Sequence, residues 1–433
     1  MTTIRSNSGW FFLALLSLLP LAFWYRIEPM SARLSTRSAT LLSIGQVTGL
    51  VGIAMFAAAI VLSSRLAYFE DYFGGLNRVY TAHHVFGSLA LVLILVHPLA
   101  LAGEYITFSS REAALLLLPS SSWPLNLGIV ALVSLVLMLV LTLFISLPYH
   151  IWEYSHRFLG LAFFLATLHT FTIRSDMSRD PTLRTYMLLL STVAVAVYVC
   201  RTALGRWLVS RFEYRVEGVR ELDDRSIRIK MAPTGRPMKF LAGQFVFVDF
   251  HQEGISAETH PYSITSMPGE ATLQVVVRSL GDYTSRLMNL KPGAIARIEG
   301  PFGRFTYHRY PNKDQVWIAG GIGITPFMSM VTTLAGSGYR VDMYYGANSR
   351  EEAVFLDDLV DMSKGGDGLR VIPFLADEHG FLTAEKVKEL SGGLQEKDIF
   401  LCGPPPMVRT LVAQFLRLGV KPGRIHSDEF ALR

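Results

Sequence analysis

Cysteine is scarce in this chain, which argues against two kinds of covalent framework. Only Cys200 and Cys402 occur among 433 residues, and they are far apart in the sequence. A disulfide framework is therefore not expected. No Cys-x-x-Cys-His motif is present, so any haem has to be held by ligands and packing rather than by thioether bonds. Internal repeats and low-complexity tracts are also absent.

Charge is sparse and unevenly distributed. Charged residues make up 17% of the chain and hydrophobic residues 51%, which is too apolar for an ordinary soluble protein. The first lysine is Lys230, and residues 1–211 hold 14 Arg against 8 Asp and Glu, whereas the remainder has a net charge of −1. The positive charge thus lies in the apolar part, so nucleic acid is not an expected partner. We predict a membrane part that ends near residue 211 and a soluble part that follows.

Six apolar stretches are each close to the roughly 20 residues that a bilayer core requires. An even number of spans places both termini on one side. The flanking arginines divide seven against seven, so charge alone does not orient the chain. Orientation has to come from the soluble part: any nicotinamide-binding domain must face the cytosol, and such a domain at the carboxyl end would place both termini there. The first stretch has a rival interpretation as a signal peptide, but no convincing small-x-small cleavage site follows it. The predicted spans are 10–25, 41–62, 79–102, 126–147, 155–173 and 185–208.

Four histidines lie inside the third and fifth apolar stretches. His83 and His97 are fourteen residues apart and His156 and His169 thirteen, which is roughly 21 Å and 19.5 Å along a helix. Ionisable side chains are costly in a bilayer, so intramembrane histidines indicate a functional site. One neutral imidazole from each of two helices gives six-coordinate, electron-carrying iron. We therefore predict two stacked b-type haems; the alternative is that these histidines only form interhelical hydrogen bonds.

Helical geometry sets a condition on the second pair. At about 100° per residue, His83 and His97 share a helix face, whereas His169 points roughly 140° away from His156. The fifth span must therefore bend, bulge or twist between its two histidines. Gly160 is the position where we expect that irregularity.

The soluble part divides into two domains by pattern. Residues 212–312 contain short strands separated by Gly and Pro turns, which predicts a small antiparallel β-barrel. Residues 313–433 alternate strands and helices, which predicts a parallel, doubly wound α/β sheet. Ligands of such sheets lie beyond the carboxyl ends of the strands, near a topological switch. The predicted domains are 1–211, 212–312 and 313–433.

Three predicted strand ends in the last domain carry residues suited to a dinucleotide. The glycine turn at 320–326 lets backbone N–H groups approach a pyrophosphate. Ser349 and Arg350 suit a 2′-phosphate, which favours NADPH over NADH, although Arg350 has acidic neighbours with which it could pair instead. Cys402 begins the third segment, at 402–405, and its alternative role is that of a small buried residue.

Two stretches of the barrel domain suit a flavin nucleotide. Residues 260–266 offer an aromatic ring and hydroxyl groups, and residues 278–284 offer a cation and backbone donors for a pyrophosphate. Taken alone, either stretch is also typical of an ordinary strand and turn.

Together these motifs resemble a known family. The soluble part resembles the ferredoxin–NADP reductase module, and the whole chain resembles the NADPH oxidases and ferric reductases, which join that module to a six-helix dihaem domain. The resemblance implies that His83 pairs with His156 on the cytosolic side and His97 with His169 on the outer side. It assigns FAD contacts to His260, Tyr262, Ser263, Thr265, Arg278 and Thr284, and NADPH contacts to Gly321, Gly323, Thr325, Pro326, Cys402 and Gly403. From the motifs themselves we add Pro261, Ile264 and Gly281 to the FAD site and Ser349, Arg350 and Pro404 to the NADPH site. Catalytic roles are expected for Ser263, Cys402 and Phe430.

Phe430 would be the terminal aromatic that covers the flavin in this family, but three residues follow it here. The ring is therefore expected to be displaced or held differently. No regulatory extension precedes the first span, as in the small bacterial members, so no obligate protein activator is expected.

The resemblance implies a chain of carriers in a bacterial inner membrane. NADPH gives a hydride to FAD, and single electrons then pass through two haems to an external acceptor. The acceptor is expected to be oxygen, giving superoxide, with ferric chelate, quinone or a periplasmic redox partner as alternatives. A different class of protein, a transporter with histidine relays and a nucleotide sensor, also fits the histidines. Four leucines at 115–118 predict that the outer connection lies over the outer haem or at the lipid interface.

Overall fold

The structure is a computed structural model that describes residues 7–106, 108–143, 145, 149–202, 204–205, 211–364 and 368–429. The chain divides into two compact units, Met1–Val209 and Ser210–Arg433. This division lies two residues before the predicted end of the membrane part at 211.

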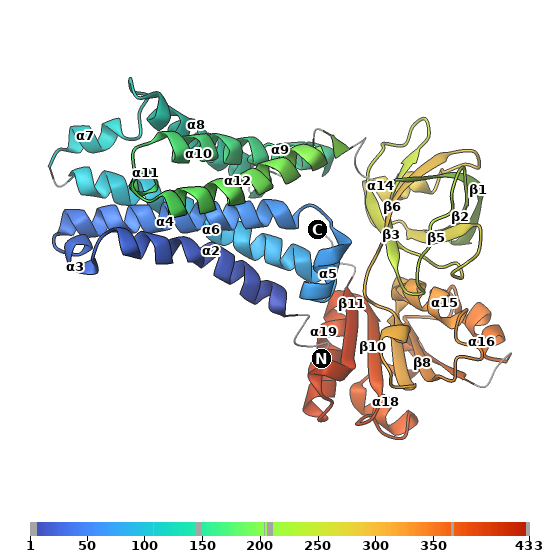
Figure 1. The fold of residues 1–433 in the computed structure, drawn as a ribbon. Coiled ribbons are helices and arrows are strands. Elements are labelled where there is room, and N and C mark those ends of the chain that lie inside the picture. The colour runs from blue at the N-terminus through green and yellow to red at the C-terminus, as the bar shows by residue number, and fades with distance from the viewer. Residues whose placement is uncertain are drawn as a thin grey trace. The chain divides into compact units, whose positions relative to one another are not determined.

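The first unit is a bundle of helices that lie alongside one another (Figure 1). Five of the described helices are long and apolar enough to cross a membrane. Three short helices, α3 (Met30–Arg33), α7 (Ser110–Leu115) and α11 (Asp176–Arg179), gather at one end of the bundle, and α5 (Ala67–Phe73) lies at the other. The long helices are α2 (Ser8–Ile27), α4 (Arg37–Leu62), α6 (Leu76–Ile106), α8 (Trp123–Leu143) and α12 (Pro181–Thr202).

The predicted span at 155–173 lies in two helices, so six continuous spans are not what the structure shows. The helices α9 (Tyr149–Arg157) and α10 (Leu159–Thr172) are interrupted at Phe158. The two segments differ in character, because α9 carries an Arg157–Glu153 ion pair at 2.6 Å whereas α10 is apolar. The expected irregularity between the two histidines is thus present, two residues before Gly160. Gly160 itself packs against the ring of Tyr198 on α12, where a Cβ would clash with that ring.

The predicted barrel domain is an antiparallel sheet of six strands in the order β4-β3-β6-β1-β2-β5. Its two edge strands meet at one isolated bridge between Ile264 and Val275, so the continuous ladder expected of a closed barrel is not found between them in the described residues. Buried apolar side chains such as Ile229, Val246 and Ile298 fill the space that the sheet encloses. The strands are β1 (Phe212–Asp223), β2 (Ser226–Pro233), β3 (Phe245–His251), β4 (His260–Ser263), β5 (Leu273–Arg278) and β6 (Ile295–Phe302), with α14 (Asp282–Leu287) after β5.

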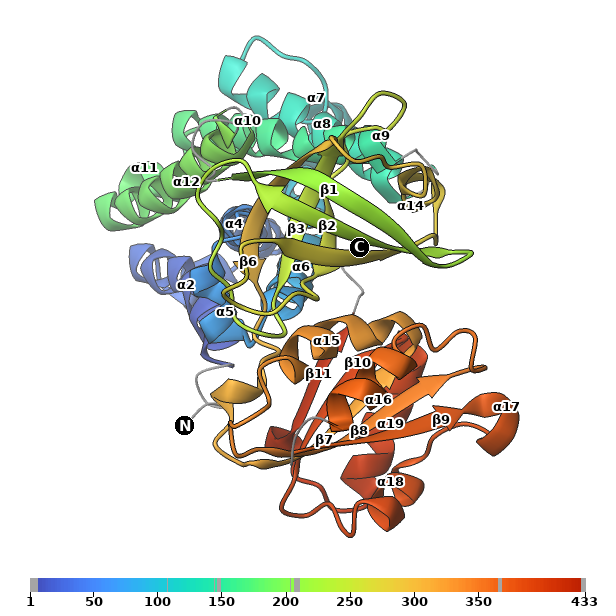
Figure 2. The same cartoon turned by 90° about the vertical axis from the view of Figure 1, so that its right-hand side faces the viewer.

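The last domain is a parallel, doubly wound sheet, which confirms the prediction. Successive residues of its central strand point to opposite faces: Trp317 packs in the core under α15 (Thr325–Val331) and α16 (Leu356–Lys364), and Ile318 in the core under α18 (Ala384–Leu390) and α19 (Pro405–Arg417). Figure 2 shows α15 and α16 on one side of the sheet and α18 on the other. The strands are β7 (Asp314–Gly320), β8 (Arg340–Ala347), β9 (Leu369–Leu375), β10 (Asp398–Gly403) and β11 (Ile425–Glu429).

The strand order locates the expected ligand site. The sheet runs β11-β10-β7-β8-β9, so the chain builds outward from β7 in one direction and then continues on the other side with β10. The topological switch therefore lies between β7 and β10. A ligand is expected beyond the carboxyl ends of these two strands.

Candidate functional site

The two histidines of α6 are both held by α4. The Nδ1–H of His83 donates to the carbonyl of Ala59 at 2.8 Å, and that of His97 donates to the carbonyl of Gly45 at 2.7 Å. Fourteen residues separate the two carbonyls, as fourteen separate the two histidines. Because Nδ1 carries the proton, Nε2 of each ring is left as the acceptor that can bind a metal.

His169 of α10 has a matching arrangement with α8. Its Nδ1–H donates to the carbonyl of Pro124 at 2.8 Å. A glycine stands four residues after each of the acceptors Gly45 and Pro124 and leaves room for the imidazole. A Cβ at Gly49 would lie 2.8 Å from Nδ1 of His97, and one at Gly128 would lie 2.7 Å from Nδ1 of His169. Both contacts are too close for a real Cβ, so any larger residue would displace the ring.

The structure brings the four predicted histidines together as two pairs. The rings of His83 and His156 are 6.0 Å apart between centroids, and His97 lies near enough to His169 for their rings to interact electrostatically. Imidazole binds first-row metals at about 2.0–2.1 Å, and two such bonds fit between rings at the inner separation. No cluster of three or more metal-binding side chains occurs in the described residues. The donor set therefore fits two bis-histidine haems rather than a multidentate metal site.

His156 differs from the other three histidines. Its ring stacks on Trp152 with 5.2 Å between centroids and an interplanar angle of 12°. Its Nδ1 is buried and has no hydrogen-bond partner among the described residues.

The predicted FAD residues include three buried polar atoms without a protein partner in the described part of the chain. They are the hydroxyls of Tyr262 and Thr265 and the Nε of Arg278. Buried polar groups are nearly always hydrogen-bonded, so a cluster of exceptions indicates a missing ligand. Burial, with the nearby Tyr283 and Glu258, raises the pKa of Tyr262 well above its usual value, which keeps its hydroxyl as a neutral donor. These residues fit a flavin nucleotide.

The remaining residues of the first FAD stretch line β4 and its continuation. His260 stacks on Tyr283 at 4.5 Å, and its Nε2 lies 3.3 Å from Glu258. Pro261 and Ser263 pair with β3, and Ser263 is buried. Ile264 is fully buried in the core, and its amide donates to Gln244.

The second FAD stretch forms a tight turn before α14. The hydroxyl of Thr284 accepts from the amides of Leu280 at 2.9 Å and Gly281 at 3.0 Å. It also donates to the carbonyl of Gly281 at 3.1 Å. In this structure Thr284 therefore shapes the turn, and its contact with FAD stays a prediction.

The two predicted NADPH motifs meet at the topological switch. A Cβ at Gly323 would clash with the carbonyl of Cys402 and would lie 2.6 Å from the Cα of Gly403. Gly321 has φ +51°, a left-handed conformation that favours glycine. The glycine turn after β7 is thus pressed against the end of β10, where a pyrophosphate is expected. Thr325 donates to the carbonyl of Ile322 at 3.0 Å, Pro326 opens α15, and Pro404 precedes α19.

Cys402 is fully buried at the carboxyl end of β10. Burial raises the pKa of its thiol well above its usual range, and the carboxylate of Asp428 adds to this. The thiol is therefore neutral, which agrees with its role as a small buried residue and leaves its catalytic role a prediction.

Ser349 and Arg350 follow β8 as expected, but both have acidic partners. The Ser349 hydroxyl donates to Glu351 at 2.5 Å and lowers the pKa of that carboxyl. Arg350 pairs with Asp357 of α16, rather than with Glu351 or Glu352. A 2′-phosphate would have to compete with these carboxylates for both side chains.

Arg278 reaches from the FAD domain to the glycine turn. Its Nη1 lies 3.6 Å from the position of a Cβ on Gly321. The charge of Arg278 also acts on the hydroxyl of Tyr345, where it opposes the rise in pKa that burial causes. Arg278 thus stands where the two nucleotide sites adjoin.

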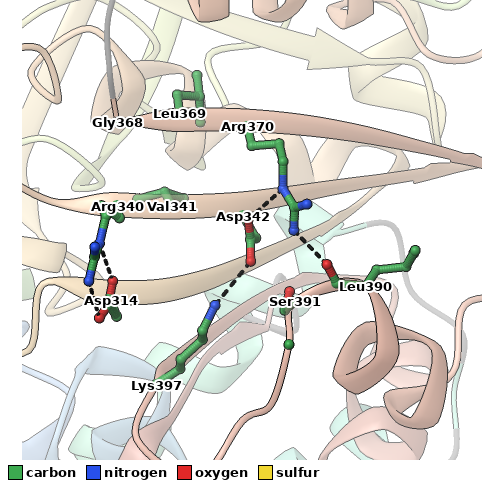
Figure 3. A pocket seen from close by; sticks show the side chains of 11 residues that line it. Asp314, Arg340, Val341, Asp342, Gly368, Leu369, Arg370, Leu390, Ser391 and Lys397 are labelled. Atoms are coloured by element: carbon green, nitrogen blue, oxygen red, sulfur yellow. Dashed lines mark hydrogen bonds and ion pairs between the residues drawn. The ribbon is translucent and has the colours of Figure 1, made fainter.

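A hollow at the opposite edge of the parallel sheet is not the dinucleotide site. It lies at the amino ends of β7, β8 and β9 (Figure 3). Arg340 binds Asp314 at 2.6 Å and 2.8 Å, and Asp342 accepts from Arg370 at 2.8 Å and Lys397 at 3.1 Å. These ion pairs tie the strand ends together, and the two carboxylates balance all but one of the three cations.

Phe430 lies outside the described residues. Sequence reasoning also missed the carbonyls of Gly45, Ala59 and Pro124, because a backbone acceptor has no residue identity. The spacing Gly45-x3-Gly49 was the available signal, since small residues four apart permit close approach of membrane helices.

Three family models match successive parts of the chain. Residues 48–167 match the ferric reductase like transmembrane component, residues 211–303 an FAD-binding domain and residues 317–413 an oxidoreductase NAD-binding domain. The first match spans α6, α8 and α9 and parts of α4 and α10. It includes His83, His97 and His156, whereas His169 lies two residues beyond its end.

Curated relatives match the soluble half. Ferredoxin–NADP reductase B of Sorangium cellulosum is 30% identical over 51% of this chain and 97% of its own length. The ferredoxin–NAD(P)+ reductase component of the naphthalene 1,2-dioxygenase/salicylate 5-hydroxylase systems of a Ralstonia species is 30% identical over 48% of this chain, and the match spans 65% of that protein. Among solved structures, a flavohemoglobin from Malassezia yamatoensis with bound FAD and heme covers 92% of this chain and 99% of its own, at TM-score 0.52 and 16% identity. At that identity the likeness concerns the fold alone.

Proposed function

The chain belongs to the family that joins a ferric-reductase-like membrane domain to a ferredoxin–NADP reductase module, and from this architecture of the NADPH oxidases and ferric reductases we propose a transmembrane electron carrier. In this proposal, electrons pass from NADPH through FAD and two b-type haems to an acceptor on the far side of the membrane. The cofactors supply the redox chemistry, and the protein supplies their order and environment.

The arrangement of the four histidines carries the proposal. They form two pairs on α6, α9 and α10, and three of them have Nδ1 fixed by a backbone carbonyl. This bond selects the tautomer in which Nε2 is a ligand. A transporter with a histidine relay would need rings that exchange protons, and a ring whose Nδ1–H is held by a carbonyl is poorly suited to that.

The soluble residues have separate tasks in the proposed reaction. Tyr262 and Thr265 offer buried hydroxyls to FAD, and Arg278 offers a cation to the phosphates beside the glycine turn. Gly321 and Gly323 let the dinucleotide backbone approach the switch between β7 and β10. Cys402 and Ser263 stand at strand ends where the nicotinamide and the flavin are expected to meet, and we assign them a role in orienting the two rings.

We assign the chain to a bacterial inner membrane, with both termini in the cytosol and no obligate protein activator. His83 and His156 then form the inner pair and His97 and His169 the outer pair. Oxygen, giving superoxide, is the proposed acceptor, because the leucine-rich segment beside α7 would hinder bulky acceptors. Ferric-chelate reduction is the second candidate, favoured by the match to the ferric reductase transmembrane component.

Haem content tests the electron path. Purified protein should contain two b-type haems and one FAD per chain. His97→Ala or His169→Ala should remove one haem while reduction of FAD by NADPH continues. Two haems per chain in either variant would refute the assignment of ligands.

The acceptor is tested by NADPH turnover of purified protein with oxygen or ferric chelate. If oxygen is reduced to superoxide, superoxide dismutase should abolish the reduction of a superoxide-detecting dye. Rapid chelate reduction that is insensitive to the dismutase would establish the ferric reductase activity instead.

A further inference from the structure

The two histidine pairs differ in the hydrogen bonding of their Nδ1 atoms. In the outer pair, both Nδ1–H groups donate to carbonyls, those of Gly45 and Pro124, at 2.7 Å and 2.8 Å. In the inner pair only His83 does so, at 2.8 Å to Ala59. The buried Nδ1 of His156 has no hydrogen-bond partner in the described part of the chain.

The break in the fifth span accounts for this difference. His169 lies on α10, which packs along α8 and reaches the carbonyl of Pro124. His156 lies on α9, on the other side of the interruption at Phe158. The helix α9 also contacts α8, but among the described residues no carbonyl of α8 accepts from His156. Its ring instead stacks on the apolar face of Trp152, which offers no acceptor in that direction.

A hydrogen bond from Nδ1–H makes an imidazole a more basic ligand. A more basic ligand stabilises ferric over ferrous iron and so lowers the reduction potential, one of the levers by which proteins tune haem. Neighbouring charges do not oppose this ordering. Arg157, which follows His156, is paired with Glu153 at 2.6 Å, and the buried Arg33–Asp176 pair near the outer end is neutral overall.

We propose that the missing acceptor at His156 gives the inner haem site a higher reduction potential than the outer site. This inference rests on the proposed function, because it requires both haems. An electron that passes from the inner to the outer site then moves to a lower reduction potential, which costs free energy. An inside-negative membrane offsets this cost, because it drives electrons outward. The outer site is thereby the stronger one-electron donor to an external acceptor.

Loss of such a hydrogen bond to a metal ligand typically changes metal affinity or activity by about 10–100-fold, and we expect an effect on the ferric to ferrous ratio at the lower end of this range, about tenfold. A tenfold change in the ferric to ferrous ratio corresponds to about 59 mV for one electron. The two sites should therefore titrate as two resolved components.

Spectroelectrochemical titration of the full-length protein in nanodiscs tests the order. His169→Ala should leave only the higher-potential component, and His83→Ala only the lower-potential one. The reverse assignment, or equal potentials in the two variants, would overturn the inference while leaving the proposed function intact. Fewer than two b-type haems in the unmodified protein would refute the proposed function itself.

A second pair of variants tests the cause. Trp152→Gln places a carbonyl oxygen one helical turn before His156. It should lower the inner potential enough to raise the ferric to ferrous ratio about tenfold at a given applied potential. Trp152→Phe keeps an apolar ring and should leave the potential within a few-fold of the original. A shift of the same size in both variants, or in neither, would overturn the role of the missing hydrogen bond.

Discussion

Two glycines of the membrane unit leave the space that two imidazole rings occupy. Gly49 and Gly128 stand four residues after the carbonyls that accept from His97 and His169. Neither glycine has a positive φ, so each is required by close approach and not by backbone conformation.

We expect Gly49→Ala to impair the outer haem site. The added Cβ would lie 2.8 Å from Nδ1 of His97, so the ring must move and the hydrogen bond to Gly45 is strained. Haem content should fall toward one per chain, or the outer component should shift in its low-spin electron paramagnetic resonance signal. Gly87→Ala on α6 is the control, because its Cβ meets nothing nearer than 3.9 Å. An equal effect of both substitutions would contradict the steric explanation.

Cofactor preference is a second prediction at the scale of residues. Arg350→Ala should reduce the preference for NADPH over NADH by roughly tenfold or more, because a hydrogen bond to a charged group contributes about 1.5–3 kcal/mol. Asp357→Asn should have the opposite effect, since it frees Arg350 from its carboxylate partner. The ratio of kcat/KM values for the two nucleotides measures both. An unchanged ratio in Arg350→Ala would remove Arg350 from the 2′-phosphate site.

The four histidines could be predicted because their side chains are visible in the sequence. The backbone carbonyls that hold three of them could not. An ionisable residue in an apolar run is visible in the sequence, and so are glycine turns after strands. The acceptors of Ala59, Gly45 and Pro124 depend on how α4 and α8 pack, which no single residue type encodes. The pairing of Arg350 with Asp357 was missed for a related reason, since Asp357 is seven residues away at the start of α16.

At the scale of elements, a buried ion pair ties together the connections at one end of the bundle. Arg33 of α3 donates to Asp176 of α11 at 3.2 Å, to Gln46 of α4 at 2.8 Å and to the carbonyl of Trp24 at 3.0 Å. Gln46 adjoins Gly45, the acceptor for His97. The side chains of Arg33 and Asp176 are only 2% and 4% exposed.

Breaking this pair should destabilise the membrane unit strongly. Asp176→Ala leaves the Arg33 charge buried without its carboxylate, which typically costs about 3–5 kcal/mol. Arg179→Ala is the matched control: Arg179 pairs with the same carboxyl at 3.2 Å but is 56% exposed, so its loss should cost about 0–1 kcal/mol. The thermal unfolding midpoint in detergent measures both. Similar midpoints for the two variants would show that the buried pair contributes little.

The segment around α7 carries another prediction. Ala113 is buried, whereas Leu115, Leu117 and Leu118 are exposed, so this element offers apolar side chains outward at its end of the bundle. Polar replacement of residues 115–118 should raise ferric-chelate reduction relative to oxygen reduction, because the bulky chelate gains access. Equal changes in the two rates would contradict a gating role.

Periodicity predicted the elements more reliably than their closure or continuity. The alternation of strands and helices after residue 313 predicted the doubly wound sheet, and its central strands β7 and β10 are buried on both faces. The barrel was not confirmed, since closure depends on how the edges at Ile264 and Val275 approach. The fifth span was predicted as one helix because hydropathy does not register a backbone break at Phe158.

On the scale of the whole molecule, the direction of electron flow relative to the membrane gives a further prediction. Moving one charge across the full membrane is worth about 2.3 kcal/mol per 100 mV. In proteoliposomes with ferricyanide in the lumen and NADPH outside, a potential negative on the NADPH side should increase the reduced fraction of the outer haem. Reversing the potential should decrease it. A reduced fraction that does not respond to the imposed potential would mean that the two pairs do not lie at different depths.

The shared spacing of α4 and α6 has a consequence for how the chain tolerates insertions and deletions. One residue inserted between Gly45 and Ala59 would rotate one carbonyl by about 100° and shift it by about 1.5 Å, so it would no longer face its histidine. An insertion in α6 alone would have the same effect. The two helices can therefore change length here only together. In the proposed electron path, α4 and α6 therefore fix the distance between the two histidine levels, and this pair of helices is the part to transplant where a constant electron-transfer distance is wanted.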